Sequence, residues 1–212
     1  MSQQEANAQP RFTGNVAPAF PLALLESVRS HDHPGEILED EDITLSLPRR
    51  FGLTDVVITQ ILRYEAAQRA GRQVRLDDVM SLIRLVMRRP DAEPILAETG
   101  RRLARWRFRR MPRLYVSLLR LAPHRLGSSA ARRVAKRTLR ELRLGSHVEV
   151  LKPYAVQVTD PATVAVDAGG PACTLVTGLL TELIRLFTGE TQDVRHEACV
   201  ARGEKNCVWV AG

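Results

Sequence analysis

All three cysteines of the chain, Cys173, Cys199 and Cys207, lie within its last 40 residues. The second and third belong to a pattern His-Glu-Ala-Cys-x7-Cys that begins at His196. Thiolates are soft donors that suit zinc, and one imidazole or carboxylate completes a tetrahedral set of four ligands. The spacing lacks the CxxC pairs of zinc fingers, so two other interpretations stay open. They are three buried small apolar side chains, or a disulfide between Cys199 and Cys207.

The cellular compartment bears on this choice. Residues 1–20 contain no basic segment followed by an apolar run, and no stretch approaches the ~20 apolar residues of a membrane span. We therefore expect a cytoplasmic protein. Thiols stay reduced in the cytoplasm, which favours metal binding by the cysteines over a disulfide. With 212 residues, 44% of them hydrophobic, the chain is long enough for an ordinary globular core.

Positive charge is concentrated in one segment. Between Arg101 and Arg143 there are fifteen Arg or Lys residues and one acid, Glu141, so this segment carries +14 and the remainder −7. The asymmetry indicates an anionic partner, which can be a nucleic acid, a membrane surface, an acidic protein or a carboxylated ligand. The alternative is a solvated helix face. Nucleic acid is the least favoured partner, because no helix-turn-helix or RNA-binding motif accompanies the charge.

The first two thirds of the chain have the hydrophobic period of helices. Residues 1–20 read as a flexible terminus, and Val57, Ile58, Ile61, Leu62 and Tyr64 form the expected apolar stripe of the second helix. The predicted helices cover 21–30, 53–69, 76–88, a segment from 94 to before Pro112, 114–121 and 129–142.

After residue 145 the pattern changes to short strands. Alternation with period two predicts strands at 147–150, 155–158 and 163–166. An apolar helix follows at 172–187, and the chain ends in a hairpin of 193–201 and 207–210. The order of elements predicts an α+β fold, in which amino-terminal helices precede a small antiparallel sheet packed against helices. We expect a helical region at 21–93 and a ligand-binding domain at 94–212.

The final hairpin carries a family signature. The sequence EACVARGEKNCVWV, from Glu197 to Val210, has the order acid, Cys, small-x-Gly-acid, two residues, Cys, aromatic, aliphatic. It resembles the 4-vinyl-reductase domain family, and Gly100 falls where that family has a glycine-containing helix. The resemblance covers about residues 95–212. The family includes aromatic-sensing domains of bacterial activators and a stand-alone protein of bacteriochlorophyll biosynthesis, which this chain resembles most in size and in its preceding helices.

The resemblance implies a structural zinc site that staples the carboxy-terminal hairpin. The family's cysteine positions correspond to Cys173, Cys199 and Cys207, and its acid position falls on His196. Histidine is a good zinc ligand and can replace the acid. Glu197 is the alternative, because in a regular strand it shares a face with Cys199 while His196 points the other way. The correspondence of the family's acid position with His196 favours His196 as the fourth ligand.

Reduction of a vinyl group requires a hydride source, and the sequence offers little to bind one. It contains no GxGxxG motif and no P-loop, and the closest candidate, Ala168 to Pro171, reads better as the turn that positions Cys173. NADPH is expected only if the protein is a true reductase, and no catalytic residue can be named. Whether it is an enzyme therefore stays open, and a binding or carrier role is at least as well supported.

The expected ligand is a Mg-tetrapyrrole intermediate of the divinyl protochlorophyllide type. The resemblance implies an apolar pocket between sheet and helices, with arginines that pair a propionate. His124 and His147 are candidate magnesium ligands, although surface histidines are as consistent with the sequence. The rival function is a sensor of small aromatics. Expected partners are other bacteriochlorophyll-synthesis enzymes, a second copy of the chain, and a membrane surface touched by the arginine-rich segment. The aromatic and apolar candidates for the pocket, each also consistent with core packing, are Trp106, Phe108, Tyr115, Leu118 and Leu119.

Overall fold

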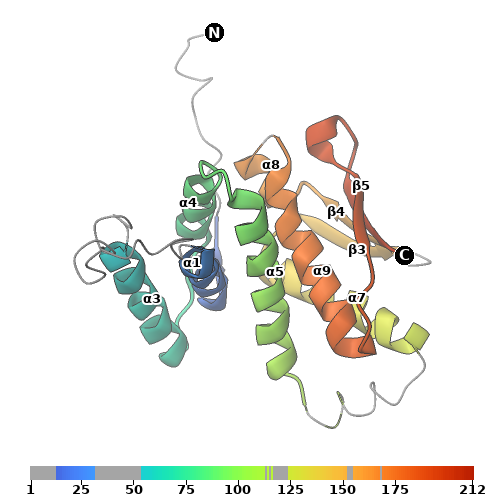
Figure 1. Cartoon of the computed structure of the whole chain (residues 1–212), viewed down its shortest axis with the longest axis horizontal. Coiled ribbons are helices and arrows are strands. Elements are labelled where there is room, and N and C mark those ends of the chain that lie inside the picture. Colours follow the sequence, from blue (N-terminus) through green and yellow to red (C-terminus); the bar gives the residue numbers. More distant parts are fainter. Residues whose placement is uncertain are drawn as a thin grey trace, which may run out of the picture.

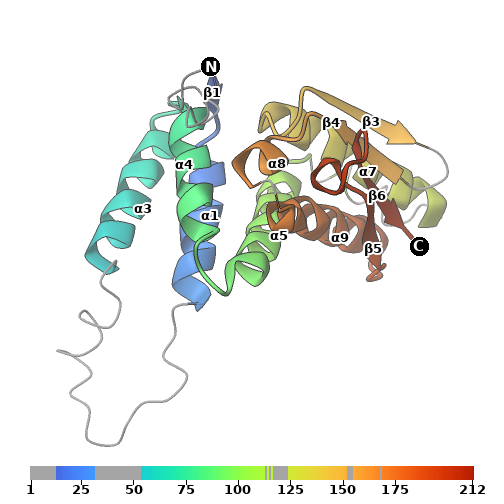
Figure 2. The same ribbon diagram turned by 90° about the horizontal axis from the view of Figure 1, so that it is seen from above.

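The structure is a computed structural model that describes residues 13–31, 54–112, 114, 116, 124–151, 155–167 and 169–212. Most of the helix predicted at 114–121 falls outside these ranges, as do Tyr115, Leu118 and Leu119. The chain forms a group of amino-terminal helices beside a sheet covered by helices, and α5 lies between the two groups (Figures 1 and 2). This is the mixed helix and sheet architecture predicted from the sequence.

The amino-terminal group contains α1 (Ala19–His31), α3 (Thr54–Arg69) and α4 (Leu76–Val86). Two short strands, β1 (Asn15–Val16) and β2 (Val74–Arg75), pair antiparallel beside them. The predicted helices at 21–30, 53–69 and 76–88 are therefore confirmed. Residues 13–20 are not the flexible segment that the sequence suggested, since Val16 and Phe20 are fully buried in the main core.

The carboxy-terminal sheet has the strand order β3-β4-β6-β5, and every neighbouring pair is antiparallel. Alternate residues of β6 are buried, because this face of the sheet packs toward α9, where Thr177 accepts a hydrogen bond from the Trp209 indole. The strands are β3 (His147–Leu151), β4 (Ala155–Thr159), β5 (Val194–Ala198) and β6 (Cys207–Ala211). The helices are α5 (Ala92–Arg109), α7 (His124–Glu141), α8 (Ala162–Val166) and α9 (Thr174–Thr188).

Helices α5 and α9 run parallel in close contact. At their amino-terminal ends Thr174 lies beside Glu93, and near their carboxy-terminal ends Phe108 packs edge-on against Phe187 with ring centroids 5.3 Å apart. Between these points a methyl group on Gly100 would overlap the backbone of α9, and one on Gly178 would overlap the carbonyl of Ala97. Glycine at both positions lets the two backbones touch, which explains a glycine inside each helix despite its low helix propensity.

Two sequence predictions fail in this fold. Residues 163–166, predicted as a strand, belong to α8, because four alternating residues are too few to separate a period of two from one of 3.6. Of the stripe predicted on α3, Ile61 and Tyr64 are buried, whereas Ile58 and Leu62 are 43% and 57% exposed. The predicted apolar stripe is thus wider than the face that packs.

One segment of the described residues, Pro171–Thr188, has the length and composition of a membrane span. Sixty-one per cent of it is buried inside the protein, against α5, α7 and the sheet. The helix thus serves here as the central core helix, and its apolar composition follows from burial on several sides.

Candidate metal centre

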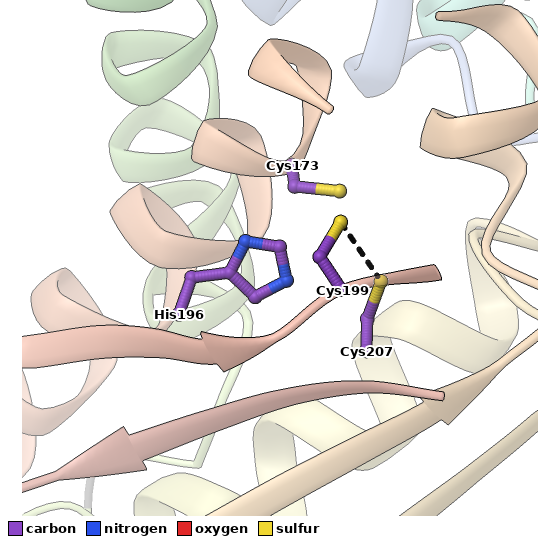
Figure 3. Close-up of side chains that lie close together, drawn as sticks. All are labelled: Cys173, His196, Cys199 and Cys207. Carbon is purple, nitrogen blue, oxygen red and sulfur yellow. Dashed lines mark hydrogen bonds between the residues drawn. The ribbon is translucent and has the colours of Figure 1, made fainter. Parts of the chain in front are cut away.

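The structure brings the four predicted ligands together. Cys173 immediately precedes α9, His196 lies on β5, Cys199 follows β5, and Cys207 begins β6 (Figure 3). One sulfur or ring nitrogen from each lies within 4.8 Å of the others. The Cys199 and Cys207 sulfurs are 3.7 Å apart and connected by a thiol hydrogen bond, and all three cysteines are free and buried, so the disulfide interpretation is wrong for this structure.

A β-bulge explains how His196 and Cys199 reach the same site. His196 pairs with Trp209, but Ala198 pairs with Val208, so two steps on β5 match one step on β6. The extra residue reverses the alternation of faces beyond it, and therefore residues three apart point to the same side. A regular strand, the premise that favoured Glu197, is the wrong geometry here.

Glu197 sits at the bulge and points away from the cluster. Its side chain is 49% exposed and lies 3.9 Å from the guanidinium of Arg195. It is absent from the group of residues whose ligand atoms converge. His196 is therefore the fourth member of the cluster.

The turn before α9 positions Cys173. The Asp167 carboxylate accepts hydrogen bonds from the backbone N–H groups of Gly169 and Ala172, which fixes the chain between them. Gly170 has φ +93°, a left-handed conformation, and a methyl group there would lie 3.5 Å from the Cys199 sulfur. Glycine thus supplies both the turn and the close approach of backbone to sulfur. The segment is a turn that places Cys173, as the sequence suggested.

Further contacts hold the ligand atoms in place. The Val200 backbone N–H donates to the Cys207 sulfur at 3.4 Å, and the Thr163 hydroxyl lies 3.3 Å from the Cys173 sulfur. The His196 ring stacks on the Trp209 indole with centroids 4.4 Å apart and planes 6° apart. Contacts of this kind orient metal ligands and tune the charge on sulfur.

The thiols influence one another's protonation. The pKa of Cys207 is lowered by hydrogen bonding with Cys173, against the desolvation that raises it, and His196 and the Val200 N–H lower it further. The same interaction with Cys207, together with burial, raises the pKa of Cys173. Burial raises the pKa of Cys199. In the absence of a cation, negative charge in the cluster is therefore favoured on Cys207, where the donors converge.

The cluster fits a tetrahedral soft cation. The Nε2 atom of His196 is buried, and no described residue meets it with hydrogen-bond geometry, although the ring lies near enough to Cys207 to lower the pKa of that thiol. It points toward the Cys199 and Cys207 sulfurs (Figure 3). Three sulfurs and one imidazole nitrogen form a donor set that zinc prefers, and four protein ligands leave no position for a substrate. A metal held here would link the terminal hairpin to the start of α9.

The other candidate ligand-binding residues do not gather at one place. Phe108 packs on Phe187, whereas Trp106 lines a separate pocket beside the amino-terminal helices. His147 lies on β3, is exposed, and contacts Glu149 at 2.9 Å. The side chain of His124 lies outside the described residues. Side chains two apart on a helix point in different directions, which explains why Trp106 and Phe108 have different surroundings.

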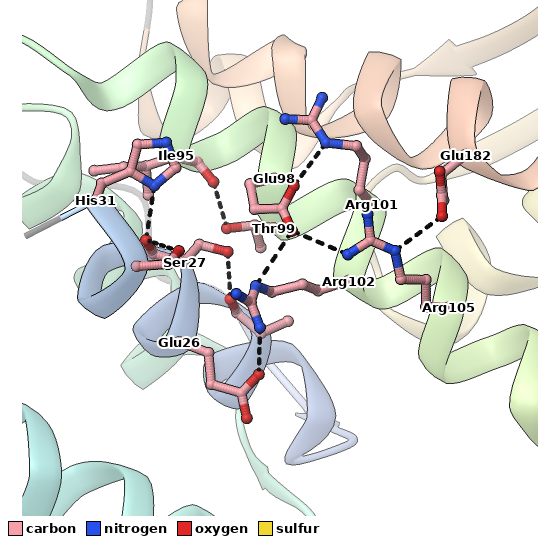
Figure 4. A network of polar contacts seen from close by, with 12 residues as sticks. Glu26, Ser27, His31, Ile95, Glu98, Thr99, Arg101, Arg102, Arg105 and Glu182 are labelled. Atoms are coloured by element: carbon pink, nitrogen blue, oxygen red, sulfur yellow. Dashed lines mark hydrogen bonds and ion pairs between the residues drawn. The ribbon is translucent and has the colours of Figure 1, made fainter. Parts of the chain in front are cut away.

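Among the described residues, five arginines of the basic segment form ion pairs, and Figure 4 shows three of them, Arg101, Arg102 and Arg105. Glu182 is 4% exposed and accepts hydrogen bonds from Arg105 and Arg185 at 2.7–2.9 Å. On α5, Glu98 contacts three arginines, of which Arg102 also reaches Glu26 of α1. Near the end of α5, Glu141 of α7 pairs with Arg107 at 2.9 Å. Three acids outside the segment, Glu26, Glu98 and Glu182, thus match part of its unbalanced charge in space.

No protein-family model matches the sequence, and no curated protein matches it. Among solved structures, a vinyl-4-reductase family protein from Methanocaldococcus jannaschii is similar over 64% of this chain and 92% of that chain. The identity is 17% and the TM-score 0.32. A likeness this distant does not establish the family, so the resemblance of the terminal hairpin stays a prediction.

Proposed function

We propose that the protein is a zinc-stapled binding factor of the 4-vinyl-reductase type. Its ligand would be a Mg-tetrapyrrole intermediate of bacteriochlorophyll synthesis, which it presents for reduction of the vinyl group or carries between enzymes. The observation that supports the proposal is the convergence of Cys173, His196, Cys199 and Cys207, from separate elements, within 4.8 Å. These are the positions that the hairpin resemblance assigns to the metal.

A binding role agrees better with this cluster than a catalytic one. A metal with four protein ligands stabilises a fold but offers no open position for chemistry. Structural zinc binding is coupled to folding, so the metal would hold the hairpin on α9 and keep the domain in its ligand-binding form. The role of the zinc in the proposed function is therefore to stabilise the domain.

The ligand is tested by absorption spectroscopy. Zinc-loaded protein is titrated with divinyl protochlorophyllide, and a saturable shift of the Soret band is expected; simple phenols are titrated in parallel. A response to phenols with no response to the pigment would favour the rival function, a sensor of small aromatics. Reduction is examined by adding NADPH to the pigment complex, alone and with candidate partner enzymes of the pathway. Reduction by the protein alone would contradict the carrier role.

We further propose that α7 contacts an anionic membrane surface. Its exposed or half-exposed residues Arg133, Lys136, Arg137 and Arg140 follow the spacing of one helix face. Flotation with vesicles containing an anionic lipid should retain the protein at low salt and release it as salt rises. The variant Arg133→Glu/Arg140→Glu should lose retention, and equal retention by neutral vesicles would contradict the proposal.

A further inference from the structure

A second site lies at the carboxy-terminal end of α5, the end opposite the cysteine cluster. Here the segment entering α1, the turn after α3 and the last turn of α5 enclose a pocket of about 200 Å³. The antiparallel packing of α1 on α5, with Arg102 paired to Glu26 midway, brings these segments together. The lining residues are Ala17, Pro18, Ala19, Gln68, Gly71, Arg72, Gln73, Trp106 and Arg110.

Two polar atoms of this lining are buried without a partner. The indole Nε1 of Trp106 donates to nothing, and the amide Oε1 of Gln68 accepts from nothing. Buried polar atoms are nearly always hydrogen-bonded, so an unpaired donor and an unpaired acceptor beside one pocket are unusual. The other tryptophan shows the usual arrangement, since the Trp209 indole donates to Thr177 at 3.0 Å.

The charge of the lining is positive. Arg72 and Arg110 border the pocket and no acidic residue does. The Arg110 guanidinium lies over the Trp106 ring, 4.6 Å from its centroid, and within the described part of the chain neither arginine forms an ion pair. The arginines of the α5 network, by contrast, are matched to glutamates. Two unmatched guanidinium groups at one pocket favour an anion.

We propose that this pocket binds a small carboxylate that also carries a hydroxyl group. The two arginines pair the carboxylate, and the Trp106 N–H donates to it. A hydroxyl both donates and accepts, so it satisfies the Gln68 amide in either orientation. A pocket of about 200 Å³ is smaller than the about 300–1,000 Å³ typical of drug-sized ligands, which excludes a tetrapyrrole from this site.

Both Arg72 and Arg110 are exposed, and exposed side chains change rotamer within nanoseconds, so the two guanidinium groups can adjust around a carboxylate. Because the indole N–H and the amide oxygen are buried, the lining must shift locally for the ligand to reach them. The site is separate from the cysteine cluster.

The test is an NMR titration of the full-length, zinc-loaded protein. The chain has two tryptophans, so a nitrogen–proton correlation spectrum contains two indole signals, and Trp106→Phe assigns them. Addition of L-lactate or glycolate should shift the Trp106 signal to saturation and leave the Trp209 signal in place. Arg110→Ala should weaken lactate binding about tenfold or more, whereas the matched control Arg109→Ala, an exposed arginine outside the pocket, should change it less than about twofold.

The same titration can overturn the proposal. Absence of a saturable shift with both hydroxycarboxylates would remove the site, and equal sensitivity of Arg109→Ala and Arg110→Ala would show charge attraction without a pocket. If acetate and inorganic phosphate bind as tightly as lactate, the proposed role of the ligand's hydroxyl group is wrong. Gln68→Leu separates the same cases, since it should weaken lactate but not acetate. None of these outcomes depends on pigment binding, so failure here leaves the proposed function standing.

Discussion

Two groups of largely buried polar residues lie along helix α9, and they differ in whether their polar atoms have partners within the protein. In its middle, the buried carboxylate of Glu182 receives a hydrogen bond from Arg105 (Figure 4) and others from Arg185. Before its first residue, Cys173 meets three other potential ligands, and no described residue meets the ring nitrogen of His196 that faces the sulfurs with hydrogen-bond geometry (Figure 3). Opposite charges complete the first group from within the chain. The second gathers three sulfurs and one imidazole nitrogen, a set of ligand atoms that could hold a metal ion.

This comparison separates a structural polar network from a ligand site. Both are largely buried and both connect elements distant in sequence, so neither burial nor connectivity distinguishes them. The partner count does, because a buried polar atom left without a partner costs about 1–3 kcal/mol. An unpaired buried atom within a group of potential ligands therefore marks a candidate metal site.

Loss of a thiol ligand should have the largest effect. Cys207→Ser is expected to lose stoichiometric zinc and to unfold the terminal hairpin, because structural zinc contributes on the order of 10 kcal/mol of apparent binding free energy to folding. Metal analysis of the purified variant and thermal denaturation measure the two consequences. Metal retained at one equivalent by both Cys207→Ser and Cys199→Ser would show that the ligands are assigned wrongly. Acidification should also release the metal, since protons compete for the thiolates.

Adding a methyl group where the backbones of α5 and α9 touch should cause the next largest loss of stability. In an exposed helix Gly→Ala stabilises by about 0.5–1 kcal/mol, but in Gly178→Ala the added methyl meets the Ala97 carbonyl. We expect a loss of about 1–3 kcal/mol, measured by urea denaturation. A gain in stability would mean that α5 and α9 are not in backbone contact. Because this change leaves every polar partner in place, the zinc content should stay at one equivalent.

Removal of the central charge of the network should have a moderate effect that depends on pH. Burial raises the pKa of Glu182, but the hydrogen bonds and charges of Arg185 and Arg105 outweigh it, so the folded-state pKa is lowered. The ionised carboxylate thus contributes stability above its unfolded pKa of about 4.3, and this contribution is lost as pH falls through the folded value. Glu182→Gln should cost about 1–2 kcal/mol at pH 7, discounted for the partly exposed arginines, and the cost should shrink as the pH is lowered below the unfolded pKa. A cost that does not change with pH would contradict the electrostatic account.

The smallest effect is expected for Glu197, the exposed residue of the bulge. Glu197→Ala removes an exposed carboxylate that contacts only Arg195, so stability should change by less than about 1 kcal/mol and zinc should remain. His196→Ala at the neighbouring position should reduce zinc affinity strongly. A competition titration with a chromogenic chelator compares the two variants. The reverse order would restore Glu197 as the ligand and would require the strand to be regular.

The sequence predicted most elements and all four members of the cluster. Long periodic segments such as 54–69 and 172–187 contain enough residues to fix their type, and the hairpin signature pointed to Cys173, more than 20 residues upstream. Short segments failed for the opposite reason. Residues 163–166 alternate like a strand, but α8 forms because Ala162 and Thr163 are buried between α4 and the turn that carries Cys173.

Composition and period are local properties, and together with the family resemblance of the hairpin they predicted the four members of the cluster and most of the helices and strands. Three-dimensional packing decided the rest. A single inserted residue in β5 turned His196 to the side of Cys199, and acids from α1 and α9 pair with arginines that look unmatched along the chain. The direction of a side chain on a bulged strand, and the partner of a charge, depend on contacts between residues far apart in sequence, which no local pattern contains.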